Sequence, residues 1–392
     1  MQITIVGGGF GGVKAALELS KNKKSQITLI SDKPYFQYYP ALFGTATGYS
    51  HLESWVPLGQ IFAGRDNVNV VIDSITTINK AEQVVTGTSG IHYPYHTLIL
   101  ALGSVTTYFG IEGLDQYAYG IKSEDEISEL KQHLFDEFSR PNGADKNFLV
   151  VGAGPTGVEL SSALGTYLTH LKKHYRQPQP RISISLIEAA PRVLPRMSEK
   201  ASSLVTARLK SLGVHVELGK KVEAETVDSL IVSGKPIKSH TVIWTSGVAN
   251  NPFFGANANQ FTLSKNGKVV VDNYLRADQN IYVIGDNAAT QFSGLAQTAL
   301  RDGVFVARHI LKKSKAKYVP KMPPVVVPVG ANWAIFEYKK LRFTGLIGSL
   351  IRKAADVVGY SDVLPFGQAL GVWHAQTIRE DDSVIAKDVR KK

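Results

Sequence analysis

The sequence predicts an α/β fold in which two domains follow one plan, one inserted into the other, with a separate C-terminal region after them. A glycine-rich stretch near the start, "ITIVGGGFGG" at 3–12, has a counterpart in "FLVVGAGPTG" at 148–157. Each stretch has a strand-like apolar run before its glycines and a helical pattern after them. A strand, a tight glycine turn and a helix form the start of a dinucleotide-binding unit. The two copies therefore predict two Rossmann-like dinucleotide-binding domains.

The first unit starts with a strand at 2–6, continues through its turn into a helix from about 11 to 21, and returns in a strand at 26–31. In such a turn the first glycine allows the tight bend and the second lets backbone N–H groups approach a pyrophosphate. The third permits close packing of the helix. The cofactor-binding candidates of this turn are Gly7, Gly9 and Gly12.

The end of the second strand, "LISDK", offers two candidates for binding a ribose. In dinucleotide-binding units an acidic residue at this strand end accepts hydrogen bonds from the adenosine ribose. Ser31 stands at the usual position and Asp32 one residue beyond it. Either Asp32 turns in to the ribose or Ser31 makes a weaker contact; the alternative for Asp32 is a solvated turn residue.

The segment between the two units is expected to line the first site. Residues 33–50 are rich in aromatic residues, proline and glycine, which favours a lining loop over a regular element. The strand in "HTLILALGS" at 96–104 ends in small residues, and Gly103 lies where the backbone has to pass close to a bound cofactor. A helix is expected at 121–138, and the polar stretch at 139–146 is expected to be a linker.

The second unit repeats the plan with a strand at 147–151, a helix from about 156 to 176, and a strand that ends at Glu188. Glu188 is placed to accept two hydrogen bonds from ribose hydroxyls. Because a carboxylate there repels the extra phosphate of NADP, this unit is expected to prefer NADH. The candidates of its turn are Gly152, Gly154 and Gly157.

Two further stretches mark the first unit as a flavin site. One is "LILALGS", and the other is "IYVIGDNA", which places Asp286 after a buried strand, where it can accept hydrogen bonds from flavin ribityl hydroxyls. We therefore expect FAD in the first domain and NADH in the second. The expected organisation is an FAD-binding domain in two parts at 1–115 and 251–325, an NADH-binding domain at 116–250, and a C-terminal region at 326–392.

The composition limits the chemistry that the chain can perform by itself. None of the 392 residues is a cysteine. Disulfides, thiolate metal sites, cysteine-ligated iron–sulfur clusters and redox steps through a thiol are therefore excluded. Redox chemistry has to belong to a bound cofactor, and no metal site is predicted.

The net charge of +11, from 44 Lys and Arg against 33 Asp and Glu, suits an anionic partner, although a generally basic enzyme is the plain alternative. Basic residues are concentrated late in the chain, as in "ARHILKKSKAKYVPK" and "EYKKLRF", with apolar stretches between them. This layout favours an anionic lipid surface over nucleic acid.

Five motifs in order, "IVGGGFGG", "ALGS", "VVGAGPTGVE", "IWTSGV" and "VIGDNA", resemble the glutathione-reductase-like flavoproteins with two dinucleotide-binding domains. The resemblance covers residues 1 to about 320 and adds Gly247 of "IWTSGV" to the cofactor-binding candidates. Within that superfamily, "PTGVELSSAL" and "GLAQTALRDG" resemble type II NADH:quinone oxidoreductases, the single-subunit, non-pumping NADH dehydrogenases of respiratory membranes.

This resemblance implies catalytic and cofactor-binding roles for Glu159, beside the nicotinamide and flavin, and for Gln297, at the border of the quinone pocket. Helix N-terminal amides around Gln297 are then placed to stabilise negative charge on the reduced flavin. Arg301 stands where the family usually has a second glutamine. It is a third catalytic candidate, either as a donor to a quinone carbonyl or as a partner of Asp302 or Glu159; a different acceptor is the other explanation.

The implied function is hydride transfer from NADH to FAD, followed by two-electron transfer to a membrane quinone without proton pumping. Two alternatives stay open: a soluble NADH-dependent ferredoxin or rubredoxin reductase, and a non-catalytic NADH-sensing flavoprotein. Met1 is followed directly by a strand pattern, which leaves no room for a signal peptide, and no apolar stretch is long enough for a membrane span. The expected location is the cytoplasmic side of the cell membrane, as a peripheral protein, with a homodimer left open.

The C-terminal region carries the prediction of membrane attachment. From Phe343, "FTGLIGSLIRKAADVVGY" predicts a helix with polar residues, among them Arg352 and Asp356, opposite an apolar stripe. With Tyr and Trp of the following "YSDVLPFGQALGVW" at headgroup level, this pattern is typical of a surface-lying anchor. A helix packed on the protein's own core is the alternative. The stripe consists of Phe343, Leu346, Ile347, Leu350, Ile351, Ala354 and Val358.

Overall fold

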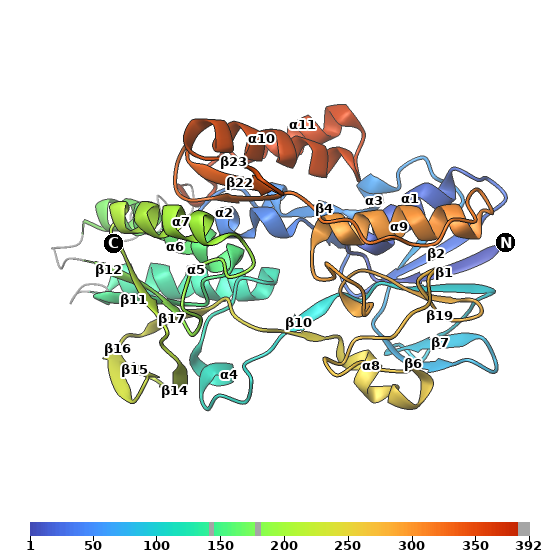
Figure 1. Ribbon diagram of the computed structural model, residues 1–392, viewed down its shortest axis with the longest axis horizontal. Helices are drawn as coiled ribbons and strands as arrows, with labels where there is room; N and C mark the ends of the chain where they lie inside the picture. Colours follow the sequence, from blue (N-terminus) through green and yellow to red (C-terminus); the bar gives the residue numbers. More distant parts are fainter. Residues whose placement is uncertain (141–144, 177–181, 383–392) are drawn as a thin grey trace.

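The computed structural model describes residues 1–140, 145–176 and 182–382, which form two α/β lobes side by side (Figure 1). The first lobe is built on a six-stranded sheet in the order β19-β20-β9-β1-β2-β5. Its neighbours pair in parallel except β19 with β20. The strands are β1 (Gln2–Val6), β2 (Gln26–Ser31), β5 (Val68–Ile72), β9 (Thr97–Leu100), β19 (Arg276–Asp278) and β20 (Ile281–Val283). The chain thus leaves this sheet after β9 and returns to it with β19.

Buried apolar side chains hold the first lobe together. Ile3, Ile5 and Leu29 of the central strands are fully buried, as expected for a parallel sheet covered on both faces. The helices α1 (Phe10–Ser20) and α9 (Ala296–Ile310) pack closely against each other. Helices from before and after the inserted second lobe therefore share one core.

The second lobe is built on a four-stranded parallel sheet in the order β13-β12-β11-β17. Its strands are β11 (Asn147–Val151), β12 (Ser183–Glu188), β13 (Val214–Leu218) and β17 (Thr241–Trp244), and its long helices are α5 (Glu124–Ser139), α6 (Pro155–His174) and α7 (Glu199–Ser211). All of these elements fall between β9 and β19. The second sheet is thus an insertion into the first lobe.

The two passages between the lobes run together, because β10 (Ser104–Thr106) pairs antiparallel with β18 (Val248–Asn250). The smaller strands are β3 (Tyr35–Gln37), β4 (Trp55–Pro57), β6 (Ile75–Asn79), β7 (Val84–Gly87), β8 (His92–Pro94), β14 (Val222–Thr226), β15 (Ser229–Val232) and β16 (Lys235–Lys238). The short helices are α2 (Leu42–Ala46), α3 (Leu58–Ile61), α4 (Leu114–Tyr117) and α8 (Pro252–Ala256), with 3-10 turns at Tyr39–Ala41, His51–Glu53, Ala258–Gln260 and Gly285–Asn287.

The predicted elements of both β-α-β units are present, with helix ends shifted by a few residues. Helix α5 starts later than expected, at Glu124, because the Ser123 side chain accepts a hydrogen bond from the Glu126 N–H and caps it. The prediction of an irregular loop at 33–50 is wrong, since this segment contains β3, a 3-10 turn and α2. Part of the predicted linker, 141–144, lies outside the described residues.

The C-terminal region forms a three-stranded antiparallel sheet followed by two helices that lie across the top of the molecule in Figure 1. The elements are β21 (Val325–Pro328), β22 (Ala334–Tyr338), β23 (Leu341–Phe343), α10 (Gly345–Ser361) and α11 (Phe366–Ala375). Among the residues that the structure describes, no helix has the length and apolar character needed to cross a bilayer.

Helix α10 turns its apolar stripe outward. Leu346, Ile347 and Leu350 are 57–68% exposed, and Val358 is 63% exposed, whereas Arg352 on the opposite side is buried. The alternative that this stripe packs on the protein's own core is therefore wrong. The expectation of Tyr360 at headgroup level is also wrong, because its side chain is fully buried.

Candidate active site

The two glycine turns have the same construction. Gly7 and Gly152 adopt positive φ angles of 118° and 104°, which glycine tolerates and other residues rarely adopt. A Cβ atom on Gly12 would lie 1.9 Å from the Gly7 carbonyl oxygen, and one on Gly157 would lie 1.8 Å from that of Gly152. The first and third glycines of each turn are thus required by the turn itself.

The middle glycines differ, because they face empty space. A Cβ atom on Gly9 or Gly154 would meet no atom within 4 Å. These residues are the N-caps of α1 and α6, and neither helix has a side-chain cap hydrogen bond at that end. The backbone N–H groups in the first turn of each helix, which in α6 begin after Pro155, are therefore available at an open cradle that suits a pyrophosphate. We call Gly7, Gly9 and Gly12 the first cradle, and Gly152, Gly154 and Gly157 the second cradle.

The ribose candidates lie at the edges of the cradles. Ser31 is buried, and its Oγ donates a hydrogen bond to the Lys33 carbonyl at 2.7 Å. Asp32 is exposed. Beside the second cradle, Glu188 accepts hydrogen bonds from the Ala153 N–H at 2.6 Å and the Ala190 N–H at 2.8 Å. The exposed Asp32 side chain is therefore better placed to contact a ligand than the buried Ser31 side chain. The Glu188 carboxylate is held in place by Ala153 of the second glycine turn.

Gly103 and Asp286 are brought together at the end of the first sheet. The Gly103 N–H donates to Asn287 Oδ1 at 3.0 Å, and Asn287 Nδ2 donates to the Gly103 carbonyl at 2.6 Å. Ser104 Oγ donates to Asp286 Oδ2 at 2.7 Å. Lys122 Nζ donates to Ser104 Oγ at 3.3 Å, and burial lowers the pKa of this lysine. Neither Asn287 nor Lys122 was singled out from the sequence.

Gly247 lies at the passage between the lobes, directly after Thr245 and Ser246, which lie against the second cradle. Its φ angle is 76°, and a Cβ atom there would lie 2.6 Å from both the Thr107 carbonyl oxygen and the Phe109 ring. The absence of a side chain at Gly247 lets the two passages between the lobes approach each other.

Glu159 belongs to a buried cluster of three carboxylates around one arginine, which we call the carboxylate cluster: Glu53, Glu159, Asp356 and Arg352. Arg352 Nη1 donates to Glu159 Oε1 at 3.1 Å, and Arg352 Nε donates to Asp356 Oδ2 at 2.8 Å. Burial raises the pKa of Glu159 to about 7, and the charge of Arg352 opposes this rise. With this pKa, Glu159 would be able to exchange a proton near neutral pH.

Glu53 is the least satisfied member of the cluster. It is 3% exposed, and its Oε1 has no hydrogen-bond partner among the described residues. Burial, followed by the charge of Asp356, raises the pKa of Glu53 to about 8. The Tyr38 hydroxyl donates a hydrogen bond to Asp356 Oδ1 at 3.0 Å, and the Tyr360 hydroxyl donates one to the backbone carbonyl of Glu53 at 2.6 Å. The cluster thus joins the first lobe, α6 and α10.

Sequence reasoning did not find this cluster as a unit. The sequence predicts Arg352 and Asp356 on the polar side of a surface helix, and of these residues it marks only Glu159 as a site candidate. The available signal was the i,i+4 spacing of Arg352 and Asp356 in a helix whose opposite side is apolar. Their position between the lobes follows from the tertiary fold.

Gln297 and Arg301 lie one turn apart on α9, and both are exposed. Gln297 is in the first turn of this helix. Arg301 Nη1 donates to the Lys321 carbonyl at 3.0 Å. Asp302 accepts hydrogen bonds from the Gly285 N–H at 3.0 Å and the Tyr318 hydroxyl at 2.6 Å. Asp302 and Glu159, the two carboxylates expected as partners of Arg301, thus bind other groups. Arg301 itself lies against the segment that leads to the C-terminal region.

The chain is similar in sequence to a family of known proteins and to individual members of it. Residues 1–303 match the family described as pyridine nucleotide-disulphide oxidoreductase. The type II NADH:quinone oxidoreductase Ndh of Mycobacterium tuberculosis is 32% identical over 333 residues, covering 79% of this chain and 72% of that protein. The type II NADH:quinone oxidoreductase of Staphylococcus aureus is 28% identical over 331 residues, covering 79% of this chain and 81% of that protein.

A solved structure shares the whole fold. NDH2 from Plasmodium falciparum, determined in complex with NADH, has a TM-score of 0.85 and 19% sequence identity, and the match covers 96% of this chain and 97% of that chain. At this identity the match shows the fold. The family match and the mycobacterial relative go further: the chain belongs to the pyridine nucleotide-disulphide oxidoreductases and, within them, to the type II NADH:quinone oxidoreductases.

Proposed function

We propose that this protein oxidises NADH with bound FAD and passes two electrons to a membrane quinone, without moving protons across the membrane. The observation that carries the proposal is the pair of open glycine cradles in one chain of this family. One dinucleotide cradle would serve a single cofactor. A second cradle gives the electron donor a place of its own.

The residues present fit both dinucleotides. The first cradle would hold the FAD diphosphate, with Asp32 and Asp286 placed for hydroxyl groups. The second cradle would hold the NADH diphosphate, with Glu188 on the adenosine ribose. When bound, FAD supplies the two-electron chemistry that a chain without cysteine lacks.

Glu159 is the proposed proton-exchanging residue, because quinone reduction consumes protons and the pKa of this buried carboxyl is about 7. Arg352 holds its Oε1 in place at 3.1 Å. Gln297, in the uncapped first turn of α9, and Arg301, one turn later, are the proposed residues on the acceptor side. Their exposure leaves them able to donate hydrogen bonds to a quinone carbonyl.

Attachment to an anionic lipid surface is proposed from α10. Its outward-facing side chains Leu346, Ile347 and Leu350 can insert among acyl chains, while the exposed Lys339 and Lys340 can meet anionic headgroups. This arrangement suits a peripheral enzyme on the cytoplasmic side of the membrane. A homodimer that buried the same face would compete with lipid, so vesicles should change its oligomeric state.

The acceptor is tested by measuring NADH oxidation with a soluble quinone, a ferredoxin and oxygen side by side. We expect the quinone to support the fastest turnover. Faster turnover with ferredoxin would favour the ferredoxin reductase alternative, and flavin reduction without turnover on any acceptor would favour an NADH sensor. The outward-facing apolar stripe of α10 favours the quinone, because an acidic soluble partner has no need of it.

A further inference from the structure

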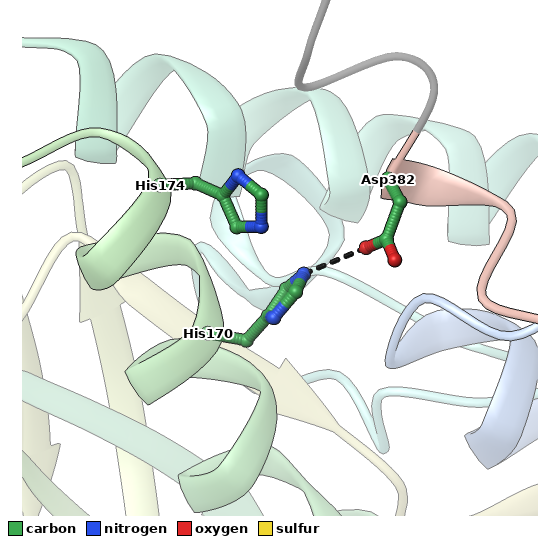
Figure 2. A group of neighbouring side chains, drawn as sticks. All are labelled: His170, His174 and Asp382. Atoms are coloured by element: carbon green, nitrogen blue, oxygen red, sulfur yellow. Dashed lines mark hydrogen bonds and ion pairs between the residues drawn. The ribbon is translucent and has the colours of Figure 1, made fainter.

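A cluster of possible metal ligands lies far along α6 from the second cradle. His170 and His174 project from the same side of the last turns of α6, and Asp382 reaches toward them from beyond α11 (Figure 2). His170 Nε2 and Asp382 Oδ1 form a hydrogen bond of 2.8 Å. The ligand atoms of all three residues lie within 4.8 Å of one another.

The donor set is one that zinc prefers. Two imidazoles at i and i+4 on a helix lie on one face, and with one carboxylate they supply three of four tetrahedral positions. Imidazole ligands select zinc and related transition metals over magnesium or calcium. The cluster also lies at the C-terminal end of α6, where the helix dipole favours a cation.

Asp382 is held near α6 by its own neighbours. We call residues 377–382 the C-terminal strap. Asp381 accepts a hydrogen bond from Tyr167 Oη at 2.6 Å and forms an ion pair with Lys131. Glu380 Oε1 lies 2.7 Å from His51 Nδ1. The strap is therefore fixed to both lobes before any metal binds, which reduces the entropy lost on assembling the three ligands.

We propose that His170, His174 and Asp382 bind one zinc-type divalent cation, which fastens the C-terminal strap to α6. Zinc–nitrogen distances of about 2.0 Å require the ligand atoms to move closer than their present separations, which rotation of the exposed Asp382 and half-buried His174 side chains permits. The fourth position is left to water, because Asp382 is half exposed. The cation adds a further link between the strap and the second lobe, which Tyr167 and Lys131 already hold through Asp381.

The test uses purified flavin-containing enzyme, freed of metal with EDTA and titrated with zinc chloride in a calorimeter. We expect one zinc ion per chain and a rise in Tm with zinc concentration. His174→Ala and Asp382→Ala should each weaken zinc binding by at least about tenfold. The matched control is His215→Ala, which removes an exposed histidine on β13 and should leave zinc binding unchanged.

His174→Ala keeps the His170–Asp382 hydrogen bond, so an unchanged flavin content and zinc-free Tm will show that it folds. Magnesium chloride at the same concentration should give no binding heat. The proposal is overturned if the wild-type enzyme binds no zinc, or if it binds zinc equally well in the His174, Asp382 and His215 variants. Equal weakening in all three would also overturn it, since surface histidines in general would then be responsible.

Discussion

Gly9 and Gly154 occupy equivalent positions in the two cradles and allow the two cofactor assignments to be separated. A valine side chain at either position would fill space that is empty around the helix start. Gly9→Val should therefore give colourless protein without FAD. Gly154→Val should remain yellow but lose NADH binding. Absorbance spectra and NADH titrations measure both, and flavin retained at full occupancy in Gly9→Val would place FAD elsewhere.

Glu188 should determine the choice between NADH and NADPH. Its carboxylate is fixed by the Ala153 and Ala190 N–H groups beside the second cradle. Glu188→Gln should relieve repulsion of the 2′-phosphate and shift the preference toward NADPH by about 1–3 kcal/mol. The ratio of kcat/KM values for the two nucleotides measures the shift. A wild-type enzyme that already prefers NADPH is incompatible with this assignment.

Arg301 should affect only the step that involves the acceptor. Arg301→Gln should leave flavin reduction by NADH nearly unchanged and alter flavin reoxidation by quinone by about 1–3 kcal/mol, as for a charged hydrogen-bond donor. Arg308→Gln, an exposed arginine later on the same helix, is the control. Stopped-flow absorbance follows the two steps separately. A response confined to the reductive step, or none, would make Arg301 a structural residue.

Glu53 should make stability depend on pH. Its pKa in the folded protein is about 8 against an ordinary value of 4.5. Since the folded state keeps this proton longer than the unfolded state, the stabilisation is present below pH 4.5 and is lost as the pH rises through 8. Glu53→Gln cannot ionise. It should match the wild type near pH 5 and exceed its unfolding free energy at pH 9 by about 2–5 kcal/mol.

Thermal unfolding from pH 5 to 9 measures this difference, which corresponds to a rise in Tm of roughly 2–6 °C in the variant at pH 9. Glu159, with a pKa of about 7, titrates in both proteins, so comparing the two removes its contribution. If the difference in Tm between the wild type and Glu53→Gln does not change with pH, the pKa of Glu53 is not raised in the folded protein.

Residues in local motifs were predictable, and residues joined by tertiary contacts were not. The cradle glycines and Glu188 follow from short-range spacing, because one strand, one turn and one helix determine their geometry. Arg352 and Glu159 are 193 positions apart in the chain, and no periodicity predicts that meeting. The cofactor and catalytic roles of these residues stay predictions.

At the scale of elements, α10 carries the sharpest prediction. Leu346→Ser with Leu350→Ser removes two outward-facing apolar side chains and should weaken binding to anionic vesicles by about 10- to 100-fold. Thermal stability should not fall, since both side chains are more than 60% exposed. Val227→Ser with Ile72→Ser removes exposed apolar side chains elsewhere and is the control. Equal vesicle binding by all three proteins would exclude α10 as the attachment surface.

The regular elements of both β-α-β units were predictable because long apolar runs and helical periodicity determine them. The segment 33–50 was not, since its strand and helix are only three and five residues long. Such pieces are stabilised by packing: Phe36 is fully buried, and the Tyr38 ring packs at a tilt against the Tyr360 ring with centroids 4.2 Å apart. The outward orientation of the α10 stripe was likewise decided by the buried Arg352 and Asp356.

At the scale of the whole molecule, the carboxylate cluster connects the parts that the proposed reaction needs. Glu159 belongs to the NADH side, Tyr38 and Glu53 to the FAD side, and Arg352 to the helix proposed to meet the membrane. The pairing of β10 with β18 connects the two lobes at a second place, away from the carboxylate cluster. The insertion of one lobe in the other was predictable from the repeated motif, and the domain limits at 115, 250 and 325 stay predictions.

Electron transfer from NADH to quinone through one chain is tested by rapid mixing of the NADH-reduced enzyme with a soluble quinone under anaerobic conditions. Flavin absorbance reports the reaction, and steady-state turnover gives the rate that reoxidation has to match. We expect quinone to restore the oxidised flavin spectrum at a rate at least equal to kcat. Reoxidation slower than turnover, or reoxidation by ferredoxin alone, would contradict it.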